Sequence, residues 1–129
     1  MPEDEVLDIL DLMLESIKLV QERFSRVGIP DDFVSTSEGV TLLDAISMRL
    51  QVIGESVKQI QKVNPVFLEK CSEIEWDKIA RFRDLVSHHY EHVDHGVVFD
   101  ICKRHIPKLG EVIQNLCKAH LGSESGESQ

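Results

Sequence analysis

Two long apolar stripes constrain the fold of this chain more than any other feature. The first stripe repeats every three or four residues and consists of Val6, Leu10, Met13, Ile17, Val20, Phe24 and Val27. The second has nearly a heptad rhythm and consists of Leu43, Ile46, Leu50, Ile53, Val57 and Ile60. Such spacing places side chains on one face of an α-helix. The stripes therefore predict two long amphipathic helices, over about residues 3–27 and 38–63.

Glycine and proline mark where these helices end or meet a neighbour. The first helix should end at Gly28-Ile-Pro30, because glycine tolerates a helix C-terminus and proline cannot continue a helix. Gly54 lies inside the second helix, at a cost of about 1 kcal/mol relative to alanine. We interpret Gly54 as a point where a neighbouring helix packs closely.

The second half of the chain predicts three further helices. Asn64-Pro65 reads as an N-cap followed by proline at the first helical position, so a short helix should run to about Cys71. A third long helix should begin at Glu75 or Trp76 and end near His92. Asp94 is a plausible N-cap for a fourth, which should run to about His120.

These elements predict an all-α fold, an up-and-down four-helix bundle with one extra short helix. A length of 129 residues fits one domain, which we expect over residues 1–121. Residues 122–129 have a sequence of glycine, serine, glutamate and glutamine without apolar side chains, so we expect a disordered tail.

Charge and cysteine content limit the possible partners and the compartment. The net charge of −9 argues against a general nucleic-acid binder, and we expect no DNA binding. Residues 78–108 differ, with four acidic and six basic residues and five of the six histidines. No apolar run approaches the ~20 residues of a membrane helix, and the acidic N-terminus is unlike a signal peptide. We expect a cytoplasmic protein with three reduced core thiols, although a catalytic cysteine is an alternative.

The predicted third helix combines an apolar sector with an unusual polar one. Ile79, Phe82, Leu85, Val86 and Val93 should face the core. The opposite sector holds Arg83, Asp84, Ser87, His88, Tyr90 and Glu91. Solvated faces usually carry lysine and glutamate, whereas these types bind phosphate, transfer protons and position hydroxyls. Either a catalytic face or an ordinary solvated surface fits this pattern.

The helical spacing predicts some internal geometry of that face. Asp84 and His88 are at positions i and i+4, so Asp84 could orient the imidazole and raise its basicity. Arg83 and His88 would be about 140° apart on a regular helix, so they could meet one phosphate only if the helix bends or a second subunit contributes. We therefore expect a symmetric dimer with the third helices near the two-fold axis.

The remaining histidines suggest two other interpretations. His89 should point into the apolar sector, as a hydrogen-bonded core histidine. His88, His92 and His95 could suggest a metal site, since histidines at i and i+4 can chelate. No cysteine or carboxylate motif completes such a set, so we expect no metal and no other cofactor.

Three segments together resemble one protein family. The run Arg83-Asp-Leu-Val-Ser-His88-His-Tyr90 is similar to the HEPN motif, in which a histidine follows an arginine after four to six residues. Its His-x-Tyr ending resembles the HepT-like branch, as do Leu50-Gln-Val-Ile-Gly-Glu55-Ser and Ile74-Glu-Trp-Asp-Lys-Ile79. The likeness covers most of residues 5–118. Where this chain has Asp84, the family often has asparagine.

The resemblance implies a metal-independent endoribonuclease. It would be a homodimer and the toxin of a type VII-like toxin–antitoxin pair. Arg83 would stabilise the scissile phosphate, and His88 would be the general acid or base, with Asp84 and Ser87 in support. Tyr90 would be AMPylated by the partner, a minimal nucleotidyltransferase antitoxin, which would place a bulky charged group beside Arg83.

Two other functions remain open at the level of sequence. In one, the chain is a non-catalytic helical adaptor whose polar face docks the nucleotidyltransferase, as the acidic net charge would allow. In the other, it is a metal-storing or metal-sensing bundle, which rests on the histidines alone.

Overall fold

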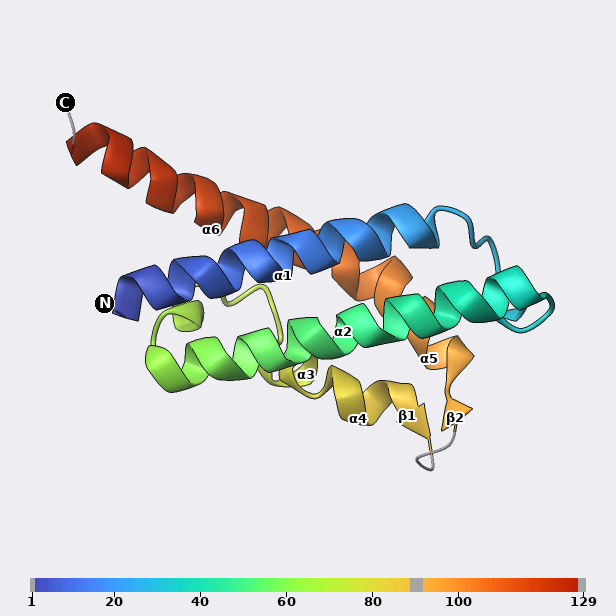
Figure 1. Cartoon of the computed structure of the whole chain (residues 1–129). Coiled ribbons are helices and arrows are strands. Elements are labelled where there is room, and N and C mark those ends of the chain that lie inside the picture. Colours follow the sequence, from blue (N-terminus) through green and yellow to red (C-terminus); the bar gives the residue numbers. More distant parts are fainter. Residues whose placement is uncertain (1, 89–91, 128–129) are drawn as a thin grey trace.

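The computed structural model describes the backbone of residues 2–88 and 92–127, and the side chains of residues 4–86, 93–119 within them. Helix α1 (Pro2–Phe24) and helix α2 (Ser37–Val63) form an antiparallel pair (Figure 1). A 3₁₀ turn, η1 (Pro30–Phe33), lies in their connection. These bounds confirm the two long helices that the apolar stripes predicted.

The core lies where the apolar stripes of α1 and α2 meet the second half of the chain. Every stripe residue is buried except Phe24, which is partly buried and packs against the core. Thr36 is the N-cap of α2, and its side-chain oxygen accepts a hydrogen bond from the amide of Gly39 at 2.9 Å. Burial of two whole helical faces is the main apolar stabilisation that such a bundle has.

The third arm of the bundle consists of short pieces. After α2 come the 3₁₀ turn η2 (Leu68–Lys70) and helix α3 (Trp76–Ala80). A turn at Arg81 leads into helix α4 (Phe82–Val86). The strands β1 (Ser87–His88) and β2 (His92–Val93) then pair antiparallel, with Ser87 opposite Val93 and His88 opposite His92. The predicted helix from Asn64 to Cys71 is thus reduced to η2.

A single long helix over residues 76–92 was therefore a wrong prediction. The amide of Asp94 donates to the carbonyl of Val86 at 2.9 Å, which ties the two ends of the segment together. In a continuous α-helix, the carbonyl of Val86 would instead accept a hydrogen bond from the amide of residue 90. The run from Val86 to Val93 consists largely of residues with modest helix propensity, so this alternative pairing prevails.

The fourth arm returns alongside α1. Helix α5 (His95–Asp100) begins at Asp94, whose carboxylate accepts from the amide of Val97 at 3.1 Å, as predicted for an N-cap. A π turn, η3 (Ile101–His105), leads into helix α6 (Ile106–Glu127). Pro107 has no amide hydrogen to donate, which favours irregular hydrogen bonding here. The helix ends later than the predicted end near His120, and the disorder of residues 122–129 stays a prediction.

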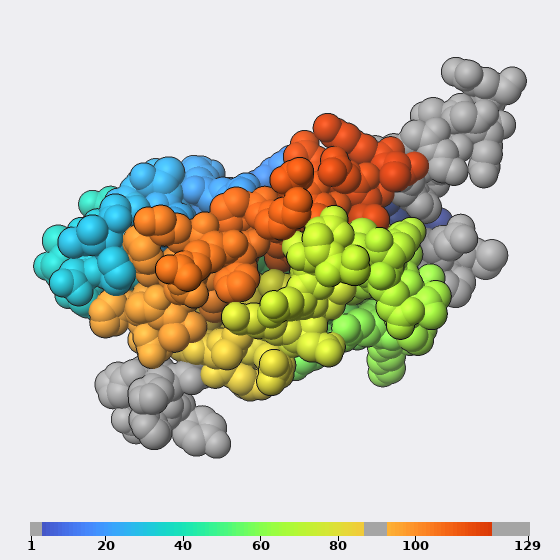
Figure 2. Space-filling view, turned by 180° about the vertical axis from the view of Figure 1, so that it is seen from behind, coloured from blue at the N-terminus to red at the C-terminus, as the bar shows by residue number. Residues whose placement is uncertain are grey.

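Together the four arms form the up-and-down all-α bundle that the sequence predicted (Figure 1). From behind, α5 and the start of α6 lie between the η1 connection and the α3–α4 segment (Figure 2). No helix in the described residues is long and apolar enough to cross a membrane.

Gly54 fixes how closely α3 approaches α2. A β-carbon at this position would lie 3.0 Å from the carbonyl oxygen of Ile79 and 3.2 Å from that of Ala80. Such contacts are tighter than most real β-carbon contacts, and the backbone of α3 would have to shift to relieve them. The close packing predicted for Gly54 is confirmed.

Replacing Gly54 with valine should therefore destabilise the protein by about 2 kcal/mol, because the branched side chain must push the backbone of α3 away. Urea unfolding measures this change. Asp44→Val is the matched control, since Asp44 lies on the same helix and is exposed, and it should cost less than about 0.5 kcal/mol. Equal stabilities of the two variants would show that α3 can move away freely.

Candidate functional site

Helix α4 presents Arg83 to solvent from a firmly anchored position. The neighbouring side chains Phe82 and Val86 are both fully buried, whereas Arg83 and Asp84 are exposed. Burial of these two anchors fixes the helix, so the base of the Arg83 side chain starts from a defined place. Among the described residues, Arg83 forms no ion pair. Its guanidinium therefore remains available for an anionic ligand.

The predicted division of this segment into two sectors is largely confirmed as far as Val86. Ile79, Phe82 and Val86 are buried, and Val93 is half-buried. Leu85 departs from the prediction because 36% of it is exposed. A short helix next to a turn does not keep the long, regular face that the helical wheel assumed.

The predicted helical geometry between Arg83, Asp84 and His88 does not hold. The helix ends at Val86, and Ser87 and His88 lie in β1. The 140° separation and the i, i+4 relation of Asp84 and His88 therefore no longer apply. The structure shows that Arg83 and His88 belong to consecutive elements, α4 and β1, but it does not describe the His88 side chain. Tyr90 and His89 lie outside the described residues.

A shallow hollow of about 350 Å³ borders Arg83 on the α1–α2 side. Its wall includes Leu12 from α1, and Met48, Val52 and Glu55 from α2. Leu12 is 45% and Met48 67% exposed, so the hollow presents exposed apolar side chains together with polar ones, among them Arg83. The Glu55 carboxylate is paired with Lys58 at 3.4 Å, which leaves it less able to neutralise Arg83. The sequence stripes did not reveal this surface, because Leu12 and Met48 lie outside them.

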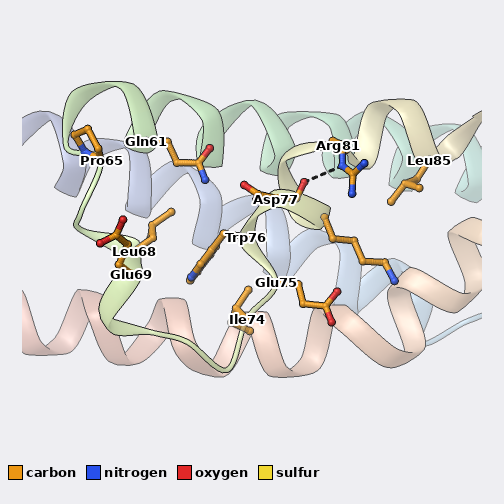
Figure 3. Close-up of a pocket in the computed structure, with 11 residues that line it drawn as sticks. Gln61, Pro65, Leu68, Glu69, Ile74, Glu75, Trp76, Asp77, Arg81 and Leu85 are labelled. Atoms are coloured by element: carbon orange, nitrogen blue, oxygen red, sulfur yellow. Dashed lines mark hydrogen bonds between the residues drawn. The ribbon is translucent and has the colours of Figure 1, made fainter.

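A larger groove of about 780 Å³ opens on another side of the same segment (Figure 3). Its lining includes Gln61 from α2, Leu68 from η2, and Ile74, Trp76, Lys78 and Arg81 from the α3 region. We call it the Trp76 groove. The indole N–H of Trp76 donates to the carbonyl of Cys71 at 3.0 Å, so the ring is held in place. The sequence analysis did not identify this groove.

The cysteines and acidic groups of the described residues do not supply a second reactive centre. All three cysteines are free thiols, Cys102 and Cys117 buried and Cys71 half-buried. Burial raises the pKa of Cys102 to about 12 and raises the pKa of the other two thiols as well. A protonated thiol is a poor nucleophile, which argues against a catalytic cysteine.

In the part of the chain whose side chains are described, no group of three or more histidine, cysteine or acidic residues could hold a metal ion. The side chains of His88 and His92 are not in that part. The absence of a metal from the site therefore stays a prediction.

Comparison with known proteins finds a family and relatives that match most of this chain. The model of the family described as ribonuclease HepT-like matches residues 13–116. A Methanocaldococcus jannaschii protein, named as a gamma-glutamylcyclotransferase and, provisionally, an RNase, is 36% identical over 81% of this chain and 44% of its own length. A Thermococcus cleftensis protein provisionally named ribonuclease HepT is 32% identical over 86% of this chain and 94% of its own length. A provisionally named RNase of Caldanaerobacter subterraneus is 29% identical over 83% of this chain and 89% of its own length.

This chain thus spans less than half of the first relative and most of the other two. No solved structure was found to match it. The family match includes α2, with the Gly54 contact, and the segment that carries Arg83 and His88. Because that match covers most of the chain, and two relatives are 36% and 32% identical to it over the aligned residues, the chain belongs to the HepT-like ribonuclease family.

Proposed function

We propose that this chain is an endoribonuclease that cleaves RNA without a metal ion, with Arg83 and His88 as its catalytic residues. The observation that carries the proposal is the position of Arg83, exposed and without an ion pair among the described residues, between two buried anchors. The family relationship and the RNase names of the relatives support it. The purified protein should cleave single-stranded RNA in the presence of a chelator, and an absolute need for Zn²⁺ would contradict the proposal.

In this mechanism Arg83 stabilises negative charge on the phosphate and His88 transfers a proton. The Arg83 guanidinium pairs with the scissile phosphate and stabilises the charge that develops on it. His88 takes the proton of the attacking 2′-hydroxyl or gives one to the leaving oxygen. Asp84 and Ser87 support His88. Their contribution rests on closeness in sequence, since the helical geometry ends at Val86.

We propose that two copies of the chain assemble with the apolar hollow beside Arg83 at their interface. Exposed Leu12 and Met48 give this face an apolar surface that a second copy would cover. The angular argument for a dimer no longer applies, because β1 replaces the predicted helix. The homodimer implied by the family and this apolar face are what support the proposal.

Light scattering should give the mass of a dimer for the wild type. Met48→Glu should shift the mass toward the monomer and reduce RNA cleavage, because it places a charge on the buried face. Val66→Glu is the matched control, since Val66 is similarly exposed and outside the hollow. A wild type that is monomeric and fully active would contradict the proposed assembly.

We further propose that the chain is the toxin of a toxin–antitoxin pair and that a minimal nucleotidyltransferase neutralises it by AMPylation of Tyr90. Tyr90 follows His88 closely in sequence, so an adenylyl group there would bring a phosphodiester charge near the site. That charge could pair with Arg83 and exclude substrate phosphate.

Co-expression with the nucleotidyltransferase should add the mass of one AMP group to the wild type and none to Tyr90→Phe. The variant should stay toxic to growth in the presence of the partner. If the partner neutralises Tyr90→Phe as well as the wild type, inhibition occurs by docking and not by modification.

A further inference from the structure

The Trp76 groove lies beside the proposed catalytic segment and is otherwise without a role. Figure 3 shows Arg81 and Leu85 at one end, Pro65 and Glu69 at the other, and Trp76 between them. The Arg81 end is continuous with α4, which begins at the next residue and carries Arg83. Its volume of about 780 Å³ falls in the range of sites that hold small organic ligands. Arg81 is two residues from Arg83 along the chain, although Arg83 lines the hollow and not this groove.

The end of the groove near α4 carries two cationic side chains, within a lining that also holds Glu69, Glu75 and Asp77. Lys78 and Arg81 are three residues apart and both line it. The Nε–H of Arg81 donates to the carbonyl of Asp77 at 3.3 Å, which holds the stem of the side chain and leaves the terminal nitrogens free to bind. Although acidic residues also line the groove, its charged side chains form no ion pair with one another among the described residues. Two uncommitted cations at one end suit a phosphate group.

The middle of the groove suits a flat ring with polar edges. Trp76 is 9% exposed and Ile74 half-buried, so together they offer an apolar wall. Gln61 can both donate and accept hydrogen bonds, and Glu75 can accept from an exocyclic amino group. An apolar wall with a few hydrogen-bonding groups and cations at one end matches the base and phosphate of a nucleotide.

We propose that the Trp76 groove is a nucleotide-binding subsite, which holds RNA that flanks the scissile bond. Lys78 and Arg81 bind a phosphate of the strand next to the one at Arg83, and the adjoining base enters the groove toward Trp76. The inference rests on the proposed ribonuclease function and names the part of the substrate that positions the strand. Arg81 and Lys78 are thus binding residues, whereas Arg83 and His88 carry the chemistry.

Trp76 is the only tryptophan of the chain, so its fluorescence reports directly on the groove. The probe is a short single-stranded RNA with 2′-O-methyl groups, which prevent attack by the 2′-hydroxyl, and with a dye at one end. Titration into the wild type should change the Trp76 emission with the same midpoint as the dye anisotropy. The double variant Lys78→Gln with Arg81→Gln should bind about tenfold more weakly and lose most of the Trp76 response.

The salt dependence of binding gives a second readout. Loss of the contacts to this one phosphate should lower the slope of log affinity against log salt by roughly 0.7 for single-stranded RNA. The matched control is Arg26→Gln with Lys118→Gln, which removes the same charge from exposed residues outside the groove. The control should keep the wild-type slope and most of the affinity. Circular dichroism should show the same helix content for all three proteins.

The results separate this inference from the function on which it rests. If the probe binds with a normal salt slope in the double variant, or binds without changing the Trp76 emission, the groove is not the subsite and the ribonuclease proposal is untouched. If no RNA binds to or is cleaved by the wild type, the ribonuclease proposal fails and the subsite fails with it.

Discussion

Replacing Arg83 with alanine should lower the rate of RNA cleavage by at least about a hundredfold while the protein stays folded. The loss is expected because a charge-assisted partner of the developing phosphate charge is typically worth two to three powers of ten in rate. Stability should change by less than about 0.5 kcal/mol, since the side chain is exposed and forms no ion pair among the described residues. Single-turnover cleavage of a synthetic RNA, together with urea unfolding, measures both quantities.

Two further variants test whether the loss of rate in Arg83→Ala comes from the guanidinium group at this position. Arg83→Lys keeps the positive charge but not the paired donors of the guanidinium, so it should recover only part of the rate. Arg26→Ala removes an exposed arginine that is distant from Arg83 in the sequence, and it should keep the wild-type rate. Full activity of Arg83→Ala would show that this side chain does not contact the reacting phosphate.

Replacement of the neighbouring residue, Phe82, should mainly lower the stability of the protein. Phe82→Ala is expected to reduce the free energy of unfolding by about 3–5 kcal/mol, because Phe82 is fully buried and its removal leaves a cavity. The free energy of unfolding of small domains is about 5–15 kcal/mol, so Phe82→Ala would remove a large part of it. Chemical denaturation followed by circular dichroism measures the change.

Leu85→Ala is the control for Phe82→Ala on the same short helix. Leu85 is 36% exposed, so its truncation should cost clearly less than that of Phe82. Similar losses for the two variants would mean that α4 does not pack with Phe82 as its anchor. Activity of Phe82→Ala should fall at least as far as the folded fraction falls, because Phe82 also anchors the helix that positions Arg83.

The helices set by local apolar periodicity could be predicted from the sequence. The stripes of α1 and α2 and the Asp94 N-cap depend on residues within a few turns of one another. Gly54 was noticed because glycine is unusual inside a helix, although the contact that explains it is with the distant residues Ile79 and Ala80. The break after Val86 depends instead on the hydrogen bond from the Asp94 amide, which closes a loop between two segments. A helical wheel cannot anticipate such a contact, because it assumes that the helix continues.

The same distinction applies to the candidate site. Exposure of Arg83 and Asp84 followed from the pattern of buried neighbours. The Trp76 groove did not, because its walls come from the end of α2, from η2 and from α3, which are brought together only by the folded chain. In the sequence, Trp76 was noticed only as a possible helix start and as part of the run from Ile74 to Ile79 that resembles the family.

Cleavage of RNA by purified protein tests the central claim most directly, with wild type and His88→Ala compared on a synthetic single-stranded RNA in excess EDTA. We predict that the wild type cleaves the RNA and that His88→Ala, with unchanged circular dichroism, is slower by about a hundredfold or more. Equal rates for the two proteins would contradict the assignment of His88. A wild type that binds the nucleotidyltransferase but cleaves no RNA would contradict the ribonuclease proposal and favour a helical adaptor.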